Sequence, residues 1–348
     1  SSGSGGLERR QGTARIEGNG TGMFLDGLLR VSGGTLDMDT DQDNFIEYST
    51  NGSAVIEVSG GSLQVGGQVR RATTTKEGVL TYTQTGGDAV FGGNINNPVA
   101  NLGVFEVLNT GSSFTYNSND GASTFSIVAD NTSTTVATLR LTPQTHSIAN
   151  GQVIQMGTAS TPAGQDDMGV QASIPLETLQ VGETGHAENP TVKLYSLPLT
   201  TDELVITDGA STFDANGFDA TINEMLDNNG VYTTSGSDAN AQVTFFSTTA
   251  TTNMTGAGTT NFWNFDKTGS GTVSVQKDVT VNNKAFLRLG TLNTNDAGFY
   301  LEGDLLHDAT HTSTLQSNAS IEDGIIFNGT GRQLLDRSGP GTSTFGML

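Results

Sequence analysis

Short runs of alternating apolar and polar residues recur along the whole chain, and small or polar residues separate them. Residues 28–31 read Leu-Leu-Arg-Val and residues 55–58 read Val-Ile-Glu-Val, for example. Alternation over a few residues predicts half-buried β-strands. Gly-Gly, Asn-Gly and Asp-Gly pairs between such runs predict turns. Residues that favour helices are scarce, so the pattern predicts an all-β chain.

A repeated signature in the first half indicates how these strands are arranged. Ser-Gly-Gly-Thr-Leu at 32–36 returns as Ser-Gly-Gly-Ser-Leu at 59–63. Thr-Gly-Gly-Asp-Ala at 85–89 and Asn-Thr-Gly-Ser-Ser-Phe at 109–114 follow at nearly the same spacing. A β-sandwich of hairpins would explain the strands but not this spacing. We therefore predict a parallel β-helix, or β-solenoid, with stacked coils of about 25–27 residues, apolar rows inside and ladders of Thr, Asn and Ser.

The second half repeats over a longer distance. Residues 212–216 align with 291–295, and Phe-Trp-Asn-Phe at 262–265 aligns with Phe-Gly-Met-Leu at 345–348. The chain therefore ends where a further unit would begin, and we expect it to be an internal piece of a longer array. The stretch 156–200 breaks the pattern with four prolines, namely Pro162, Pro175, Pro190 and Pro198.

These observations predict three regions. A first solenoid block covers positions 1–155, and an irregular excursion or insertion covers 156–200. A second solenoid block covers 201–348, with repeats of about 80 residues.

Many of these strings resemble the repeats of giant cell-surface proteins of gliding Bacteroidota. The similar strings are 45–49, 68–71, 103–107, 204–207, 212–219, 243–245, 262–265, 279–281, 290–293 and 326–333. The resemblance implies a β-helical filament that is exported by the type IX pathway, attached to the outer membrane and moved along the cell as an adhesin. The implied partners are extracellular surfaces or polysaccharide, neighbouring repeats of the same polypeptide, and the motility or secretion machinery.

Composition narrows the function further. The net charge of −21 and the pI near 4.2 argue against binding nucleic acid or anionic lipid, both of which attract Lys and Arg. The chain has no cysteine, which excludes disulfides and thiol catalysis. Its longest apolar runs are too short to span a membrane, and its first residues do not read as a signal peptide.

An acidic segment is the candidate metal site. Carboxylates at alternate positions suit Ca²⁺, and they occur at Asp37, Asp39, Asp41 and Asp43. Counted from Asp39, the segment matches an EF-hand loop at positions 1, 3 and 5, but Asn44 replaces its glycine and Thr50 its last carboxylate. Calcium binding and a solvated acidic corner therefore both remain open, and no cofactor is required.

Catalytic signals are weak. Asp166-Asp167 followed by Gly185-His186 has the spacing of part of a polygalacturonase site, but the further acid and the basic clamp are missing. His307 and His311 are four residues apart in what we interpret as an exposed loop rather than a helix. Arg70, Arg71 and Lys76 form a small basic patch, which we interpret as a surface corner.

The aromatic residues Phe262, Trp263 and Phe265 offer either a sugar-binding platform or a core stack, and their recurrence favours the stack. We therefore expect a non-catalytic adhesin or filament segment. A glycan- or calcium-binding solenoid module is the alternative, and a polysaccharide-degrading β-helix enzyme is a third.

Overall fold

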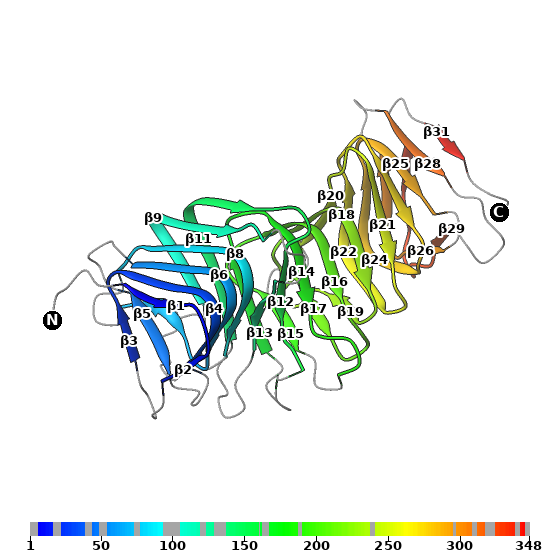
Figure 1. Cartoon of the computed structure of the whole chain (residues 1–348). Coiled ribbons are helices and arrows are strands. Elements are labelled where there is room, and N and C mark those ends of the chain that lie inside the picture. Colours follow the sequence, from blue (N-terminus) through cyan, green and yellow to red (C-terminus); the bar gives the residue numbers. More distant parts are fainter. Residues whose placement is uncertain are drawn as a thin grey trace. The chain divides into compact units, whose positions relative to one another are not determined.

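The computed structural model describes most of the chain as parallel β-structure (Figure 1). The described residues are 6–16, 22–38, 44–48, 54–72, 77–92, 105–118, 123–128, 137–159, 161, 167–186, 190–236, 241–294, 297–307, 312–316, 324–337 and 342–344. They contain no α-helix, and every strand pairing with a defined register is parallel. The chain divides into two compact units, residues 1–192 and 193–348. The predicted all-β parallel solenoid is therefore confirmed.

Unit 1 contains the first fourteen strands and the start of the fifteenth. They are β1 (Leu7–Arg9), β2 (Thr13–Arg15), β3 (Gly22–Leu25), β4 (Leu28–Met38), β5 (Phe45–Tyr48), β6 (Ala54–Val65), β7 (Val69–Arg71), β8 (Leu80–Phe91), β9 (Phe105–Tyr116), β10 (Phe125–Ile127), β11 (Ala137–Ile148), β12 (Val153–Met156), β13 (Asp167–Ala172), β14 (Leu176–Val181) and β15 (Thr191–Leu194).

Unit 2 contains the remaining strands. They are β16 (Leu199–Ile206), β17 (Thr212–Asp214), β18 (Ala220–Asn228), β19 (Val231–Thr233), β20 (Val243–Phe246), β21 (Thr251–Thr255), β22 (Thr259–Lys267), β23 (Thr272–Val275), β24 (Val279–Leu287), β25 (Gly290–Asn293), β26 (Gly298–Leu301), β27 (Asp304–His307), β28 (Ser313–Gln316), β29 (Gly324–Phe327), β30 (Leu335–Arg337) and β31 (Thr342–Thr344).

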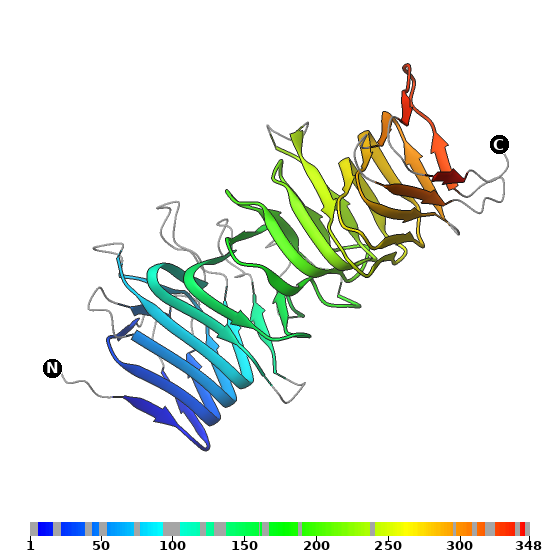
Figure 2. The ribbon, with the colours of Figure 1, turned by 90° about the horizontal axis from the view of Figure 1, so that it is seen from above.

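The repeated Ser-Gly-Gly signature forms a corner in three consecutive long strands. β4, β6 and β8 lie side by side (Figure 2, blue to cyan), and the register places Leu29 opposite Ile56 and Ile56 opposite Tyr82. Gly34, Gly61 and Gly87 occupy the corner with φ of 70°, 75° and 74°. A Cβ on Gly61 would lie 2.2 Å from the carbonyl oxygen of Gly34 on the previous coil. The corner therefore requires glycine for its left-handed backbone and for the close approach of the coils.

The coil length then increases, so the prediction of a constant coil length is wrong beyond this point. In the next coil Tyr82 pairs with Phe114 and Ala89 pairs with Phe125, and both steps are several positions longer than the earlier ones. Gly111 therefore does not stack on Gly87 but lies beside Val79. The shifted register brings aromatic rings together in the core, with Tyr82 and Phe114 stacked at a centroid distance of 5.4 Å.

The predicted irregular excursion at 156–200 is wrong for the described part of this segment. β13 continues the ladder of β11, with Leu139 opposite Val170, and β14 continues that of β12, with Ile154 opposite Leu179. The described prolines Pro175, Pro190 and Pro198 each stand immediately before a strand. A proline there breaks no ladder hydrogen bond, so these prolines mark corners rather than an insertion.

Unit 2 has coils of uneven length whose strands form three faces. The first face contains β19, β22, β24, β26 and β29, in this order. The second contains β20, β22, β24, β27 and β30, because β22 and β24 are long enough to belong to two faces. The third contains β18, β21, β23, β25, β28 and β31. One coil runs from Asn261 to its ladder partner Thr280, whereas a later and longer one runs from Leu305 to Leu335. Residues 212–214 and 291–293, aligned by sequence, lie on different faces in β17 and β25.

Inward-facing apolar rows form the core of each unit. In unit 2, for example, Leu204, Leu226, Met254 and Val275 occupy one row and are at most 1% exposed. Leu7 is 50% and Leu335 46% exposed, whereas their ladder partners Leu29 and Leu305 are fully buried.

Candidate functional surfaces

The predicted calcium ligands fall largely outside the described residues, which include Asp37 but not Asp39, Asp41 or Asp43. Asp37 lies near the end of β4, and its carboxylate accepts a hydrogen bond from Arg15 Nε at 2.9 Å. One of the four predicted ligands is thus already paired with a cation. Within the ranges that the structure describes, no three His, Asp or Glu side chains gather as a metal site. Calcium binding by the acidic segment stays a prediction.

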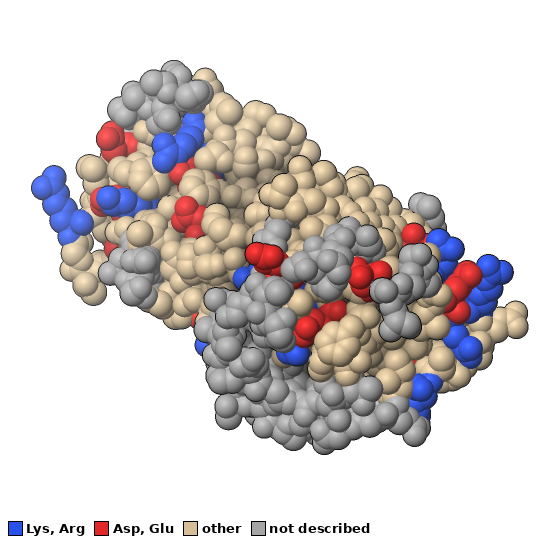
Figure 3. Space-filling model, turned by 90° about the vertical axis from the view of Figure 1, so that its left-hand side faces the viewer, with Lys and Arg blue, Asp and Glu red and all other residues tan. Residues whose placement is uncertain are grey.

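A column of alternating charges runs across unit 1. Glu47 lies opposite Arg70 in the ladder of β5 and β7, and Glu106 lies opposite Arg140 in that of β9 and β11. Arg140 donates to Glu106, while Arg71 Nε lies 3.4 Å from the other carboxylate oxygen of Glu106. Parallel strands place matching positions of successive coils about 4.8 Å apart, so opposite charges stack directly. On the surface seen in Figure 3, acidic and basic side chains are likewise interspersed.

This column changes the interpretation of the basic patch. Arg70 and Arg71 are only 13% and 14% exposed in their side chains, and both are ion-paired, so they are not a free surface corner. Arg70 also lies over the ring of Phe45, 4.4 Å from its centroid. The side chain of Glu106 is fully buried. Sequence reasoning missed Glu106 because its partner Arg140 belongs to the next coil and lies far from it in the sequence.

In unit 2, two buried lysines donate hydrogen bonds to backbone carbonyls at the ends of strands or between strands. Lys277 Nζ donates to the carbonyl oxygens of Asn228 at 2.9 Å and Gly258 at 2.8 Å. Lys267 Nζ donates to the carbonyls of Gly269 and Leu289. Burial lowers the pKa of each lysine from 10.5 to about 8, because an apolar environment disfavours the charged ammonium. These contacts are all with backbone carbonyls, which points to a structural role.

The histidines and acids considered for catalysis are placed only in part. His307 lies in β27 and not in an exposed loop, so that interpretation is wrong for this residue. It is 6% exposed, and its Nδ1 is 2.9 Å from Ser313 Oγ. His186 is near Glu183 in a turn, with 3.8 Å between Nε2 and the carboxylate. Asp166, the side chain of Asp167, Lys76 and His311 lie outside the description.

The aromatic cluster divides between core and surface. Phe262 and Phe265 are fully buried and lie 5.7 Å and 5.2 Å, between ring centroids, from Phe246. The core-stack interpretation is therefore confirmed for these two residues. Trp263 stands between them in β22 and is partly exposed, so the three residues do not form one flat platform.

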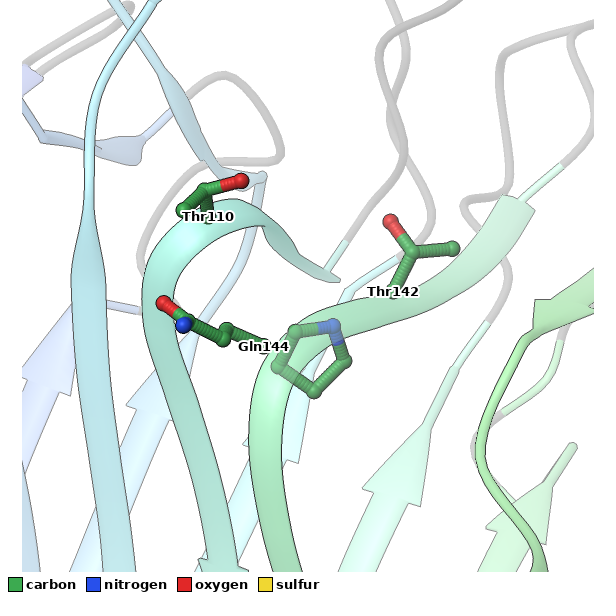
Figure 4. Close-up of a pocket in the computed structure, with 4 residues that line it drawn as sticks. Thr110, Thr142 and Gln144 are labelled. Carbon is green, nitrogen blue, oxygen red and sulfur yellow. The ribbon is translucent and has the colours of Figure 1, made fainter.

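A shallow hollow lies at the corner between β9 and β11 (Figure 4). Its volume is about 340 Å³, and Thr110, Thr142, Pro143 and Gln144 line it. Gln144 reaches toward the turn that carries Thr110 and accepts a hydrogen bond from Gly111 N at 2.6 Å. The hollow offers two hydroxyls and a proline ring but none of the charged groups that catalysis of glycoside cleavage uses.

Comparisons with known proteins assign no family. No family model, no curated protein and no solved structure matches this chain. In the part of the chain that the structure describes, no helix has the length and apolar character needed to cross a bilayer.

Proposed function

We propose that the chain is a non-catalytic segment of a long secreted cell-surface adhesin or filament, which provides reach and attachment to surfaces. The supporting observation is the stacking of parallel coils around a continuous apolar core within each unit. Each added coil lengthens such a stack by about 4.8 Å without a new core or a disulfide. A fold that can be lengthened by repeating one kind of coil suits a protein that must extend from a cell.

The placement of the ionisable groups supports the non-catalytic part of the proposal. Glu47 and Glu106 are both ion-paired with arginines, and Lys267 and Lys277 both donate to backbone carbonyls. A glycosidase instead needs two carboxyl groups facing a substrate across about 5–9.5 Å. The buried charges described here join neighbouring coils.

The proposed setting is extracellular, at the outer membrane, and the proposed partners are extracellular surfaces or polysaccharide. The proposal includes export by the type IX pathway and gliding-type motility or adhesion, which rest on the sequence resemblance. The net charge of −21 supports a soluble surface that resists self-association.

Two measurements on the purified chain test this function. Beads coated with the chain are expected to resist detachment by flow from glass and from polysaccharide films more strongly than beads coated with the heat-unfolded chain. Incubation with pectin, cellulose and other polysaccharides is expected to release no reducing ends. Equal detachment of both bead types would refute adhesion, and released reducing ends would establish an enzyme instead.

A further inference from the structure

Threonines occupy one position in successive strands on the third face of unit 2. The register places Thr251 opposite Thr272, Thr272 opposite Thr291, and Thr291 opposite Thr314. The next strand, β31, continues the backbone ladder with Thr342 at this position. β25 and β28 lie side by side in the orange part of Figure 1. The chain therefore stacks one residue type over five coils, although the coils differ in length.

A second polar row runs beside the threonines. Two residues further along the same strands are Asn253, Ser274, Asn293 and Gln316, which are again in register. The residues between the two rows, namely Thr252, Val273, Leu292 and Leu315, are buried. Both polar rows therefore point outward. We call the eight outward residues of β21, β23, β25 and β28 the threonine face.

The threonine face presents a regular array of hydrogen-bonding groups. Successive coils are about 4.8 Å apart, and outward residues of one strand are about 6.7 Å apart. Among the described residues, the hydroxyls of Thr251, Thr272, Thr291 and Thr314 make no hydrogen bond within the protein. Thr252, by contrast, points inward and donates to the carbonyl of Asn223 at 2.7 Å. The outward hydroxyls are therefore available to a ligand.

The face is also uncharged, although the chain carries a net charge of −21. All eight of its side chains are neutral, with hydroxyls in one row and mainly amides in the other. Gln276 donates to both Asn253 Oδ1 at 3.1 Å and Ser274 Oγ at 3.3 Å, which links two coils of the second row. A neutral partner rich in hydroxyl groups matches this chemistry better than an ionic one.

We propose that the threonine face binds an extended, neutral β-linked glucan lying along the stacking direction of the coils. A pyranose ring in such a chain is about as long as one coil spacing, so each ring meets one threonine and one residue of the second row. The inference deepens the proposed function and rests on it, since it names the polysaccharide and the face. Each contact is individually weak, so firm attachment requires several coils at once.

Microcrystalline cellulose provides a direct test with the full chain. We expect the wild type to sediment with cellulose and not with starch granules. The α-linked glucan of starch is helical rather than extended, so its rings cannot follow the spacing of the protein coils one by one. The variant T272V/T291V removes two hydroxyls from the threonine face while preserving β-branched side chains of similar size. We expect its association constant for cellulose to fall about tenfold, since two modest hydrogen bonds are lost.

The matched control is T212V/T259V, which removes two hydroxyls from outward positions on another face of unit 2. This variant is expected to bind cellulose like the wild type. Wild-type chain that does not sediment with cellulose, or equal losses in both variants, would overturn the inference. Bead adhesion to glass that persists in either case would leave the adhesive function standing, so the two failures are distinguishable.

Discussion

Replacement of Gly61 by alanine tests whether the coils are in contact through their glycine corners. The left-handed backbone at Gly61, with φ of 75°, costs a non-glycine residue about 1–2 kcal/mol. The added Cβ would also lie 2.2 Å from Gly34 O and 2.7 Å from Gly33 C, both backbone atoms that cannot rotate away. Relief of such overpacking typically costs about 1–3 kcal/mol. We therefore expect Gly61→Ala to lower the free energy of unfolding by about 2–5 kcal/mol.

Gly151 provides the matched control in the same unit. Its φ is 77°, but a Cβ there would meet no atom within 4 Å. Gly151→Ala should therefore cost only the backbone strain, about 1–2 kcal/mol. The difference between the two variants isolates the contact between coils.

Urea unfolding followed by far-UV circular dichroism measures both variants. The single tryptophan, Trp263, lies in unit 2, so its fluorescence does not report on unit 1. Hydrogen exchange followed by mass spectrometry is therefore used to show that the loss of stability is in unit 1. If Gly61→Ala and Gly151→Ala lower the free energy of unfolding equally, the coils do not pack as closely at this corner as described.

Two further predictions concern buried charges. Glu106→Gln should destabilise the fold by about 3 kcal/mol because it leaves Arg71 and Arg140 without their carboxylate, whereas Glu57→Gln, at a partly exposed pair, should cost about 0–1 kcal/mol in the same urea titration. Between pH 8 and 10.5, Lys277 is protonated in the unfolded chain but largely neutral in the folded one, so its contribution makes the free energy of unfolding rise with pH. Lys277→Met should remove this contribution, which raises the free energy of unfolding by no more than about 3 kcal/mol between pH 7.5 and pH 10. Urea unfolding curves of both proteins at the two pH values measure it. A pH dependence that is the same in the variant and the wild type would contradict the lowered pKa.

The sequence predicts the architecture where one residue type marks one corner. Ser-Gly-Gly recurs because the corner at Gly34, Gly61 and Gly87 tolerates only glycine, so the period of the coil is visible in the sequence. At Gly111 the same local signature forms a different corner. There the register places Phe114 opposite Tyr82 on the previous coil, a pairing that local spacing does not encode.

The sites depend on register more than on motif. Glu106 and Arg140 form an ion pair because the register of β9 and β11 aligns them. No sequence motif near either residue predicts this pair. The threonines at 251, 272, 291 and 314 are unevenly spaced along the sequence but lie directly opposite one another in the ladder. An irregular spacing of this kind hides a ladder that is regular in space. The sequence therefore predicts that ladders of Thr and Asn exist, but it does not predict which strands form the threonine face.

The stacking of the coils has a mechanical consequence. A coil between two others, such as the one that carries Ile56, is covered on two sides by its neighbours in the ladders of β4, β6 and β8, whereas a coil at the end of any stack is covered on one side only. Peeling a terminal coil therefore breaks one interface and leaves the next coil as the new end. Each peeled coil, of about 20–35 residues, releases roughly 70–120 Å of chain. Under tension, such a stack would lengthen in many small steps and dissipate work before any single attachment had to carry the whole load.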